Sequence, residues 1–471
     1  MNTCEATPSA AQEIRIQSLG TPEIDSPLSR NLATGGERRV VFTVDEELVD
    51  EGAAPRPMSF ELAGPRDRIY FDPSKTKCAI VTCGGLCPGI NDVIRAIVMT
   101  AYNAYRVPSV LGIRYGLQGF IPSYRYDVRE LAPRDVEGIH EFGGTILGTS
   151  RGPQSSSEIA TALERLNISA LFIIGGDGTM KAAASIQQEV ARRGKHISIV
   201  GIPKTIDNDL VLTDHTPGYG SAAKYVASTV REIAIDASVY DNKPSVTIVE
   251  IMGRHAGWLT AASVLARKFE GDNPVLIYLP EVAFSPDAFI EKVKEKLTKT
   301  SNLVVCISEG INDGNGTFVC ELASDVGTDT FGHKMLTGSG KYLENLVKEK
   351  LGIKVRSVEL NVCQRCSSSC LSATDLDEAA ASGRFAVSAA LDGETGKMIN
   401  FIRKSDDPYI LEFGTADVNE ICNKEKAVPE EWITKDGSDI RDEFIAYARP
   451  LIQGSVEVPM KDGLPYFAFR K

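Results

Sequence analysis

The chain has 471 residues, of which 43% are hydrophobic and 24% charged, and this composition is typical of a globular protein with two or three domains. Its net charge of −12 provides no long-range attraction for nucleic acid or an anionic membrane, so any phosphate must be held by locally placed basic groups. The longest apolar runs, such as PVLIYLP at 274–280, have the length of a strand, whereas a membrane span requires about 20 residues. The 10 cysteines resemble cytosolic thiols and no signal-peptide pattern opens the sequence, so we expect a cytoplasmic protein.

Residues 1–75 are rich in Ser, Thr, Pro and Glu, and we expect them to form an N-terminal extension that is partly disordered. From residue 77 onward, apolar strand patterns alternate with amphipathic helical patterns. The predicted strands include KCAIVTC (77–83), SALFIIGG (169–176), ISIVGIP (197–203), SVTIVEIM (245–252), PVLIYLP and NLVVCISEG (302–310). This alternation predicts parallel sheets with helices on both faces, and ligands in such folds bind where strand ends meet helix starts.

Glycine-rich turns follow these strands. CGGLCPGIND (83–92) opens a helix, where backbone N–H groups can approach an anion. IIGGDGTM (173–180) places glycines around Asp177, with Thr179 as the expected N-cap of the next helix. A phosphate on this turn would bring Asp177 within reach of its Mg²⁺. Together with Arg151 in LGTSRGPQ (147–154), the turns predict a nucleoside triphosphate site without a P-loop, although each turn alone can also be purely structural.

The stretch GIPKTIDNDL (201–210) places acidic side chains behind a lysine and a threonine at a strand end. If a phosphoryl donor lies on the glycine turns, Asp207 is placed to accept the proton of an attacking hydroxyl, while Lys204 and Thr205 can contact the transferred group. Taken alone, the same carboxylates can also face solvent or cap a helix.

Later strand ends supply groups for a second substrate. The segment EIMGRHAGW (250–258) contributes Arg254, and Arg356 and Arg365 follow later in the chain; guanidinium groups match the paired oxygens of a sugar phosphate. The carboxylate of Glu309 suits a hydroxyl-rich ligand. The cysteine cluster CQRCSSSC (363–370) is compatible with a metal clip, but no fourth ligand is near, which favours free thiols.

The order GGLCPGIND, GTSRG, GGDGT, PKTIDND, MGR, SEG, QR resembles that of the 6-phosphofructokinase family over roughly residues 64–400. The segment from AGPRDRIYFDP to GGTILGTSRG looks most like the ATP-dependent enzymes of plants and trypanosomatid protists. The resemblance implies a glycolytic kinase that transfers the γ-phosphoryl group of Mg-ATP to the 1-hydroxyl of fructose 6-phosphate. It also implies a homotetramer or dimer whose sugar site borrows basic residues from a neighbouring subunit.

The fold that the resemblance implies is α/β, with two Rossmann-like three-layer domains of mostly parallel sheets plus N- and C-terminal extensions. The expected ATP-binding domain comprises residues 76–218 and about 366–430. The expected sugar-phosphate domain comprises residues 219–365, and residues 431–471 form the C-terminal extension.

The resemblance assigns individual residues by position. The expected ATP contacts are Gly85, Arg151, Gly152, Gly176, Asp177, Gly178 and Thr179. Asp177 is also the expected magnesium ligand. The expected catalytic group consists of Asp207 as base with Lys204, Thr205 and Arg254. The expected fructose 6-phosphate contacts are Thr205, Ile206, Asp207, Met252, Gly253, Arg254, Glu309, Arg356, Val362, Cys363, Gln364 and Arg365.

Two positions depart from the bacterial pattern of the family: Ser245 stands where an arginine is common, and Val362 where a histidine often precedes the QR arginine. Both changes weaken the expected binding of the sugar phosphate and mildly favour a non-catalytic regulatory subunit as an alternative. NAD and lipid kinases share GGDGT but lack the later motifs. A pyrophosphate-dependent enzyme is a further alternative, because Lys204 also occurs in such enzymes. Gly178 favours ATP, since pyrophosphate enzymes typically carry a second aspartate there.

Overall fold

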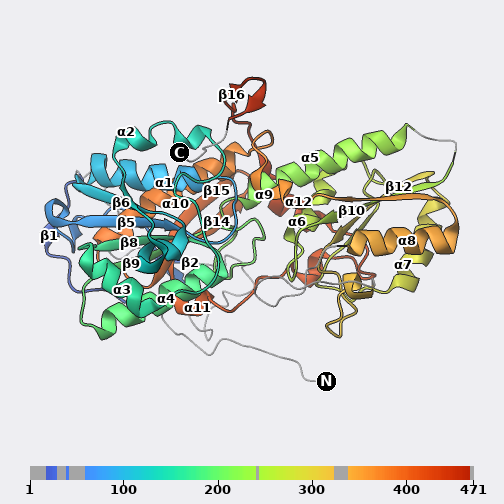
Figure 1. Cartoon of the computed structure of the whole chain (residues 1–471). Helices are drawn as coiled ribbons and strands as arrows, with labels where there is room; N and C mark the ends of the chain where they lie inside the picture. The colour runs from blue at the N-terminus through green and yellow to red at the C-terminus, as the bar shows by residue number, and fades with distance from the viewer. Residues whose placement is uncertain (1–16, 29–38, 42–58, 240–242, 323–337, 467–471) are drawn as a thin grey trace, which may run out of the picture.

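The computed structural model describes residues 17–28, 39–41, 59–239, 243–322 and 338–466. The chain forms two lobes, each built around a mainly parallel sheet with helices on both faces (Figure 1). The expected α/β class with mostly parallel sheets is therefore confirmed. Within the described ranges, none of the helices combines the length and apolar character that a bilayer crossing demands.

The larger sheet has nine strands in the order β2-β3-β15-β14-β9-β8-β5-β6-β7. Strands β14, β9, β8, β5 and β6 pair in parallel, and the pairs toward both edges are antiparallel. The strands are β2 (Arg39–Val41), β3 (Ser59–Leu62), β5 (Lys77–Thr82), β6 (Ser109–Ile113), β7 (Val128–Glu130), β8 (Ala170–Gly175), β9 (Ser198–Pro203), β14 (Lys397–Asp406) and β15 (Tyr409–Asp417). β3 adds a strand to this sheet from within the segment 1–75, whose first residues lie outside the described ranges.

Helices cover both faces of the larger sheet. Because side chains alternate along a strand, Phe172 and Ile174 of β8 pack on one side with residues of α1 (Ile90–Met99) and α10 (Ala373–Leu391). Leu171 and Ile173 pack on the other side with α3 (Ser156–Arg165) and α4 (Asp177–Arg192). The resulting three layers hold the ends of β5, β8 and β9 at one rim.

The smaller sheet has the order β11-β12-β10-β13, and all its pairs are parallel. Its strands are β10 (Ser245–Ile251), β11 (Leu276–Tyr278), β12 (Asn302–Ser308) and β13 (Lys354–Glu359). One face packs against α7 (Pro286–Leu297) and α8 (Ser339–Leu351). The other packs against α5 (Tyr219–Ser238) and α6 (Trp258–Ala261), which share one apolar core with α1 and α10. The two lobes are thus joined by a continuous core.

The chain returns to the first lobe after the second sheet is complete. In Figure 1 the orange α10, β14 and β15 lie among the blue and teal elements of that lobe. The remaining elements are short: β1 (Ile24–Asp25), β4 (Arg68–Ile69), α2 (Pro133–Val136), α9 (Cys363–Cys366), α11 (Val418–Ile421), α12 (Asp442–Ala448), β16 (Met460–Lys461) and β17 (Leu464–Pro465).

Candidate active site

A cleft with a volume of about 760 Å³ lies where three neighbouring parallel strands of the larger sheet end. β5, β8 and β9 are adjacent, so the turns that follow them meet at the same rim. The turn residues that line the cleft are 83–86, 150–154, 176–179 and 204–207. The glycine turns and the TID segment, predicted separately from sequence, are therefore brought together around one space large enough for a nucleotide.

Asp177 is the first residue of α4, and its carboxylate borders the cleft. Oδ1 of Asp177 accepts a hydrogen bond from the backbone N–H of Asn423 at 2.7 Å. The prediction that Thr179 is the N-cap is wrong: Gly176 is the N-cap, and Thr179 donates its backbone N–H to the Gly176 carbonyl at 2.9 Å. Because the helix starts three residues earlier than predicted, the backbone N–H groups of Asp177 and Gly178 begin its first turn, and both residues line the cleft.

Lys204 is 4% exposed, and its ammonium group donates to the Gly85 carbonyl. It therefore lies across the rim between the ends of β9 and β5. Burial lowers the pKa of Lys204. A Cβ built on Gly85 would lie 3.4 Å from Nη2 of Arg151 and 3.8 Å from Nε of Arg365, so two guanidinium groups approach the same turn. This wall of the cleft concentrates positive charge in an otherwise acidic protein.

Two carboxylates of the IDND segment, those of Asp207 and Asp209, also belong to residues that line the cleft. The backbone N–H of Asp207 donates to Oγ1 of Thr205 at 3.1 Å, which tightens the turn just past β9. Burial, with a further contribution from the neighbouring charge of Asp207, raises the pKa of Asp209 to about 7. Oδ1 of Asp209 is buried and has no hydrogen-bond partner among the described residues. Asp207 had a role predicted from sequence, whereas Asp209 had none.

The MGR, SEG and QR motifs meet at the ends of β10 and β12. The Met252 N–H donates to Oε1 of Gln364 at 3.2 Å, and the Gly253 N–H donates to Oε1 of Glu309 at 3.4 Å. Burial is the main cause that raises the pKa of Glu309 to about 7, with Asp207 adding to the effect and Arg365 opposing it. Of these three motifs, Arg365 lines the cleft. Met252, Gly253, Arg254, Glu309 and Gln364 are not among its lining residues.

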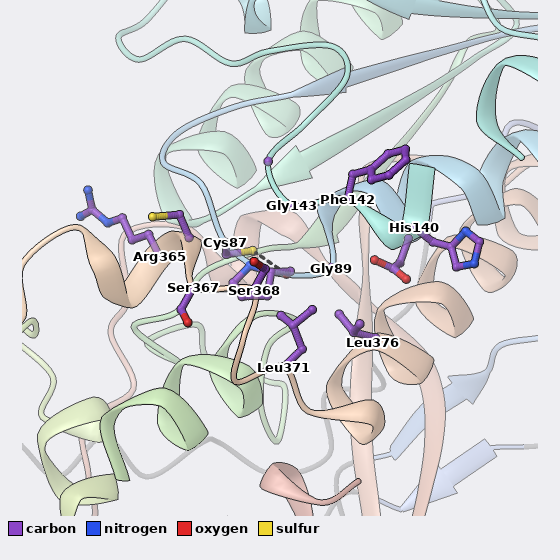
Figure 2. Close-up of a pocket in the computed structure, with 14 residues that line it drawn as sticks. Cys87, Gly89, His140, Phe142, Gly143, Arg365, Ser367, Ser368, Leu371 and Leu376 are labelled. Atoms are coloured by element: carbon purple, nitrogen blue, oxygen red, sulfur yellow. Dashed lines mark hydrogen bonds between the residues drawn. The ribbon is translucent and has the colours of Figure 1, made fainter. Parts of the chain in front are cut away.

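Arg365 borders the large cleft and also a second pocket of about 20 Å³, which has room for about one water molecule. Figure 2 shows the Arg365 side chain extending away from the other labelled residues of that small pocket. Cys363 and Cys366 of the same helix are exposed free thiols. Only the large cleft has the size of a substrate site among these two.

Arg356 and Val362 are not brought to the cleft within one chain. Arg356, on the edge strand β13, pairs with Asp236 of α5 and donates from Nε to Oγ1 of Thr247 at 3.2 Å. Val362 is 57% exposed. Ser245, where an arginine is common in the family, bonds Oδ1 of Asn302 at 2.9 Å.

Asn423 is a cleft residue that the sequence analysis missed. Besides its backbone bond to Asp177, its Oδ1 accepts from Nζ of Lys181 at 3.1 Å. The contact with Asp177 spans 246 positions of the chain, and Asn423 belongs to no recognisable motif. No local signal could have found it.

Comparisons with known proteins agree on one family. A family model described as phosphofructokinase matches residues 77–390. The pyrophosphate–fructose 6-phosphate 1-phosphotransferase of Halomonas elongata is 34% identical over 372 residues, which cover 77% of this chain and 88% of that protein. The ATP-dependent 6-phosphofructokinase of Amycolatopsis methanolica is 35% identical over 356 residues, which cover 72% of this chain and 75% of that protein.

The chain is also similar to a third relative and to a solved structure. The ATP-dependent 6-phosphofructokinase of Trypanosoma cruzi is 38% identical over 296 residues, which cover 62% of this chain and 58% of that protein. The crystal structure of a pyrophosphate-dependent phosphofructokinase from Marinobacter aquaeolei matches with a TM-score of 0.75 and 30% identity, covering 84% of this chain and 96% of that chain. Relatives named for either donor are thus similar to this chain.

Proposed function

This chain belongs to the phosphofructokinase family, and from that premise we propose that it transfers the γ-phosphoryl group of Mg-ATP to the 1-hydroxyl of fructose 6-phosphate. Phosphoryl transfer to fructose 6-phosphate is the activity that the family and its relatives support. The identity of the donor is the finer part of the proposal, and it rests on the extent and lining of the cleft.

The observation that carries the choice of ATP is that the cleft continues well beyond the phosphate turns. From Asp177 it extends along α4 to Ile186 and across to Ile159 and Leu117. These apolar side chains provide surface on which a heteroaromatic base can rest, whereas pyrophosphate has no group to place there. A volume of about 760 Å³ is likewise far more than a diphosphate would fill.

Gly178 supports the same choice. It lies on the cleft in the first turn of α4, it is exposed, and a Cβ built there would meet no atom within 4 Å. The space beside Asp177 is therefore open for a longer polyphosphate, whose oxygens can be met by backbone N–H groups.

The residues around the cleft suit phosphoryl transfer. Asp207 is the proposed base for the 1-hydroxyl, and Lys204, Arg151 and Arg365 supply positive charge where phosphate charge must be stabilised. Arg254 is the proposed partner of the reacting sugar phosphate. Because phosphoryl transfer needs little covalent help, positioning and charge account for most of the expected acceleration.

The carboxylates of the cleft fit a magnesium ion. Asp177, Asp207 and Asp209 all line it, and the unpartnered buried Oδ1 of Asp209 is a hard oxygen of the kind that Mg²⁺ prefers. Among the described residues, no group of three His, Cys, Asp or Glu side chains is placed to hold a metal ion. Asp177 is the proposed protein ligand. Bound magnesium would neutralise charge on the donor phosphates.

Pyrophosphate is the second candidate donor, because Lys204 places an ammonium group directly at the phosphate end of the cleft. A lysine there can hold the departing phosphate of either donor. The experiment is a coupled assay of the purified chain with fructose 6-phosphate, magnesium and either ATP or pyrophosphate. We expect kcat/KM to be higher with ATP by at least about tenfold, a difference of about 1.4 kcal/mol. Faster turnover with pyrophosphate would overturn the donor assignment, and no turnover with either donor would overturn the reaction.

A further inference from the structure

A segment outside the residues that match the family model runs along the back of the IDND turn. Residues 423–428, here called the strap, follow α11. At its start, the backbone N–H of Asn423 donates a hydrogen bond to Oδ1 of Asp177. The backbone N–H of Lys426 donates to the Asp209 carbonyl at 2.8 Å. At its end, the backbone N–H of Val428 donates to Oε1 of Glu281 at 2.9 Å. The strap therefore contacts the donor turn, the IDND turn and the second lobe in succession.

The ammonium group of Lys426 is surrounded by oxygen acceptors. Nζ donates to Oδ1 of Asn208 at 3.2 Å, to the Thr213 carbonyl at 3.1 Å and to the Asp214 carbonyl at 2.7 Å. The same nitrogen lies 5.0 Å from the centroid of the Trp258 ring, whose Nε1 donates to the Lys426 carbonyl at 2.7 Å. Burial lowers the pKa of Lys426 to about 8. The three N–H donors of this ammonium group thus all form hydrogen bonds with residues 208–214.

Asn208 lies between the two carboxylates of the site and is held at both ends of its side chain. It is fully buried and has a φ of 55°, in the left-handed region, which asparagine adopts more readily than other non-glycine residues. Its Oδ1 accepts from Lys426, and its Nδ2 donates to Oη of Tyr447 at 2.9 Å. Because Asn208 turns the chain between Asp207 and Asp209, its backbone conformation determines where both carboxylates point.

We propose that Lys426 is a positioning residue for phosphoryl transfer, which acts through Asn208 to hold Asp207 at the cleft. The inference rests on the proposed function, and it adds a residue of the C-terminal strap to the machinery of the reaction. A base must be placed within about 1 Å of its productive position to keep its full effect, so a small rotation at Asn208 is enough to slow the reaction. Substrate affinity depends on other groups and is expected to change little.

The test replaces Lys426 with methionine, which keeps the unbranched side chain out to Cε and removes the ammonium group. Lys424→Met is the matched control, because Lys424 lies in the same strap, is 53% exposed and pairs only on the surface with Glu420 at 3.0 Å. We expect Lys426→Met to lower kcat by about 10- to 100-fold with each KM within about threefold, and Lys424→Met to match the unmodified protein. Activity is expressed per ligand-binding site, so that a loss of folded protein does not count as a loss of kcat.

A double-mutant cycle separates positioning from general support of the fold. Asn208→Gly keeps the positive φ and removes both side-chain bonds. If Lys426 acts through Asn208, the double variant Lys426→Met/Asn208→Gly has the same kcat as Asn208→Gly alone. If the double variant instead loses kcat by the product of the two single losses, the proposal is overturned. If Lys426→Met does not fold, Asn208→Gly alone must show the same loss of kcat at nearly constant KM, and normal turnover in that variant refutes the inference.

Hydrogen exchange gives a readout that does not depend on the reaction. In Lys426→Met the amides of residues 205–213 are expected to exchange at least about tenfold faster, while those of β5 are unchanged. Unaltered exchange at 205–213, or equal acceleration throughout the protein, would overturn the positioning role. An unmodified protein that is inactive with both donors would instead refute the proposed function, and the exchange experiment would still decide whether Lys426 holds the turn.

Discussion

Replacing Gly178 with aspartate should abolish most ATP-driven turnover while leaving the fold intact. Gly178 has an ordinary helical backbone, and there is space for a side chain, since a Cβ built there meets no atom within 4 Å. An acidic side chain in the first turn of α4 is favourable for the helix by about 0.3–1 kcal/mol, and at this exposed position water screens its repulsion from Asp177. The thermal midpoint is therefore expected to stay within a few degrees of that of the unmodified protein.

The catalytic loss follows from charge. A carboxylate at Gly178 would lie beside Asp177 at the path of the donor phosphates. Two like charges at about 4 Å repel by about 4 kcal/mol at an effective dielectric constant near 20, which corresponds to about 10³-fold in kcat/KM for ATP. Gly178→Asn is the matched control, because it has the same size without the charge, and we expect it to lose less than about tenfold.

The assay measures kcat/KM for ATP and for pyrophosphate in Gly178→Asp, Gly178→Asn and the unmodified protein, together with the dissociation constant of fructose 6-phosphate. Sugar-phosphate affinity should be equal in all three proteins. The reasoning is refuted if Gly178→Asp uses ATP within about threefold of the unmodified protein. It is also refuted if the asparagine variant loses as much as the aspartate variant, because the effect would then be one of size.

Three other changes test separate parts of the structure. Asp207→Asn should lower kcat by about 10²- to 10⁴-fold with nearly unchanged affinities, and near-normal turnover would remove Asp207 as the base. Arg356→Ala should raise the KM for fructose 6-phosphate with little change in kcat, if Arg356 reaches the sugar phosphate of a neighbouring subunit, because that phosphate is remote from the reacting oxygen. An unchanged KM would leave Arg356 with its bonds to Asp236 and Thr247 alone. Burial, reinforced by Glu394, raises the pKa of Asp392 to about 9, so the folded state keeps a proton that the unfolded state loses near its ordinary value. The unmodified protein should therefore lose stability as pH rises from about 4 to 9. In chemical denaturation, the free energy of unfolding of Asp392→Asn should rise relative to that of the unmodified protein by up to about 1.4 kcal/mol per pH unit over that range. A difference in unfolding free energy that does not change with pH would contradict the assignment.

The rim of the larger sheet was predictable because its signals are local. Gly85, Gly176 and Asp207 each follow an apolar run of strand length, and parallel strands place their carboxyl ends at one edge. The sequence pattern alone was enough to bring these turns together. The antiparallel pairing of β15 with β3 had no comparable signal, since β3 belongs to the segment 1–75, whose composition predicted an extension.

The parts of the site that sequence reasoning missed depend on contacts between distant segments. Asn423 reaches Asp177 across 246 positions, and Lys426 reaches Asn208 across 218. Neither residue lies in a motif, and a lysine in a charged stretch is usually solvated. The direction of Lys204 toward the Gly85 carbonyl is likewise set by the strand order β9-β8-β5, which brings the end of β9 and the turn after β5 to the same rim.

The order in which the chain leaves the ribosome has a consequence for the larger sheet. β14 pairs with β9 through Lys397 and Val200, so the inner edge of β9 has no partner until residue 397 has been synthesised. The whole smaller sheet is translated in between and, with its own helices, can fold first. A nascent chain with an open parallel edge is prone to aggregate. The length of the inserted second lobe therefore sets how long the protein needs protection during translation.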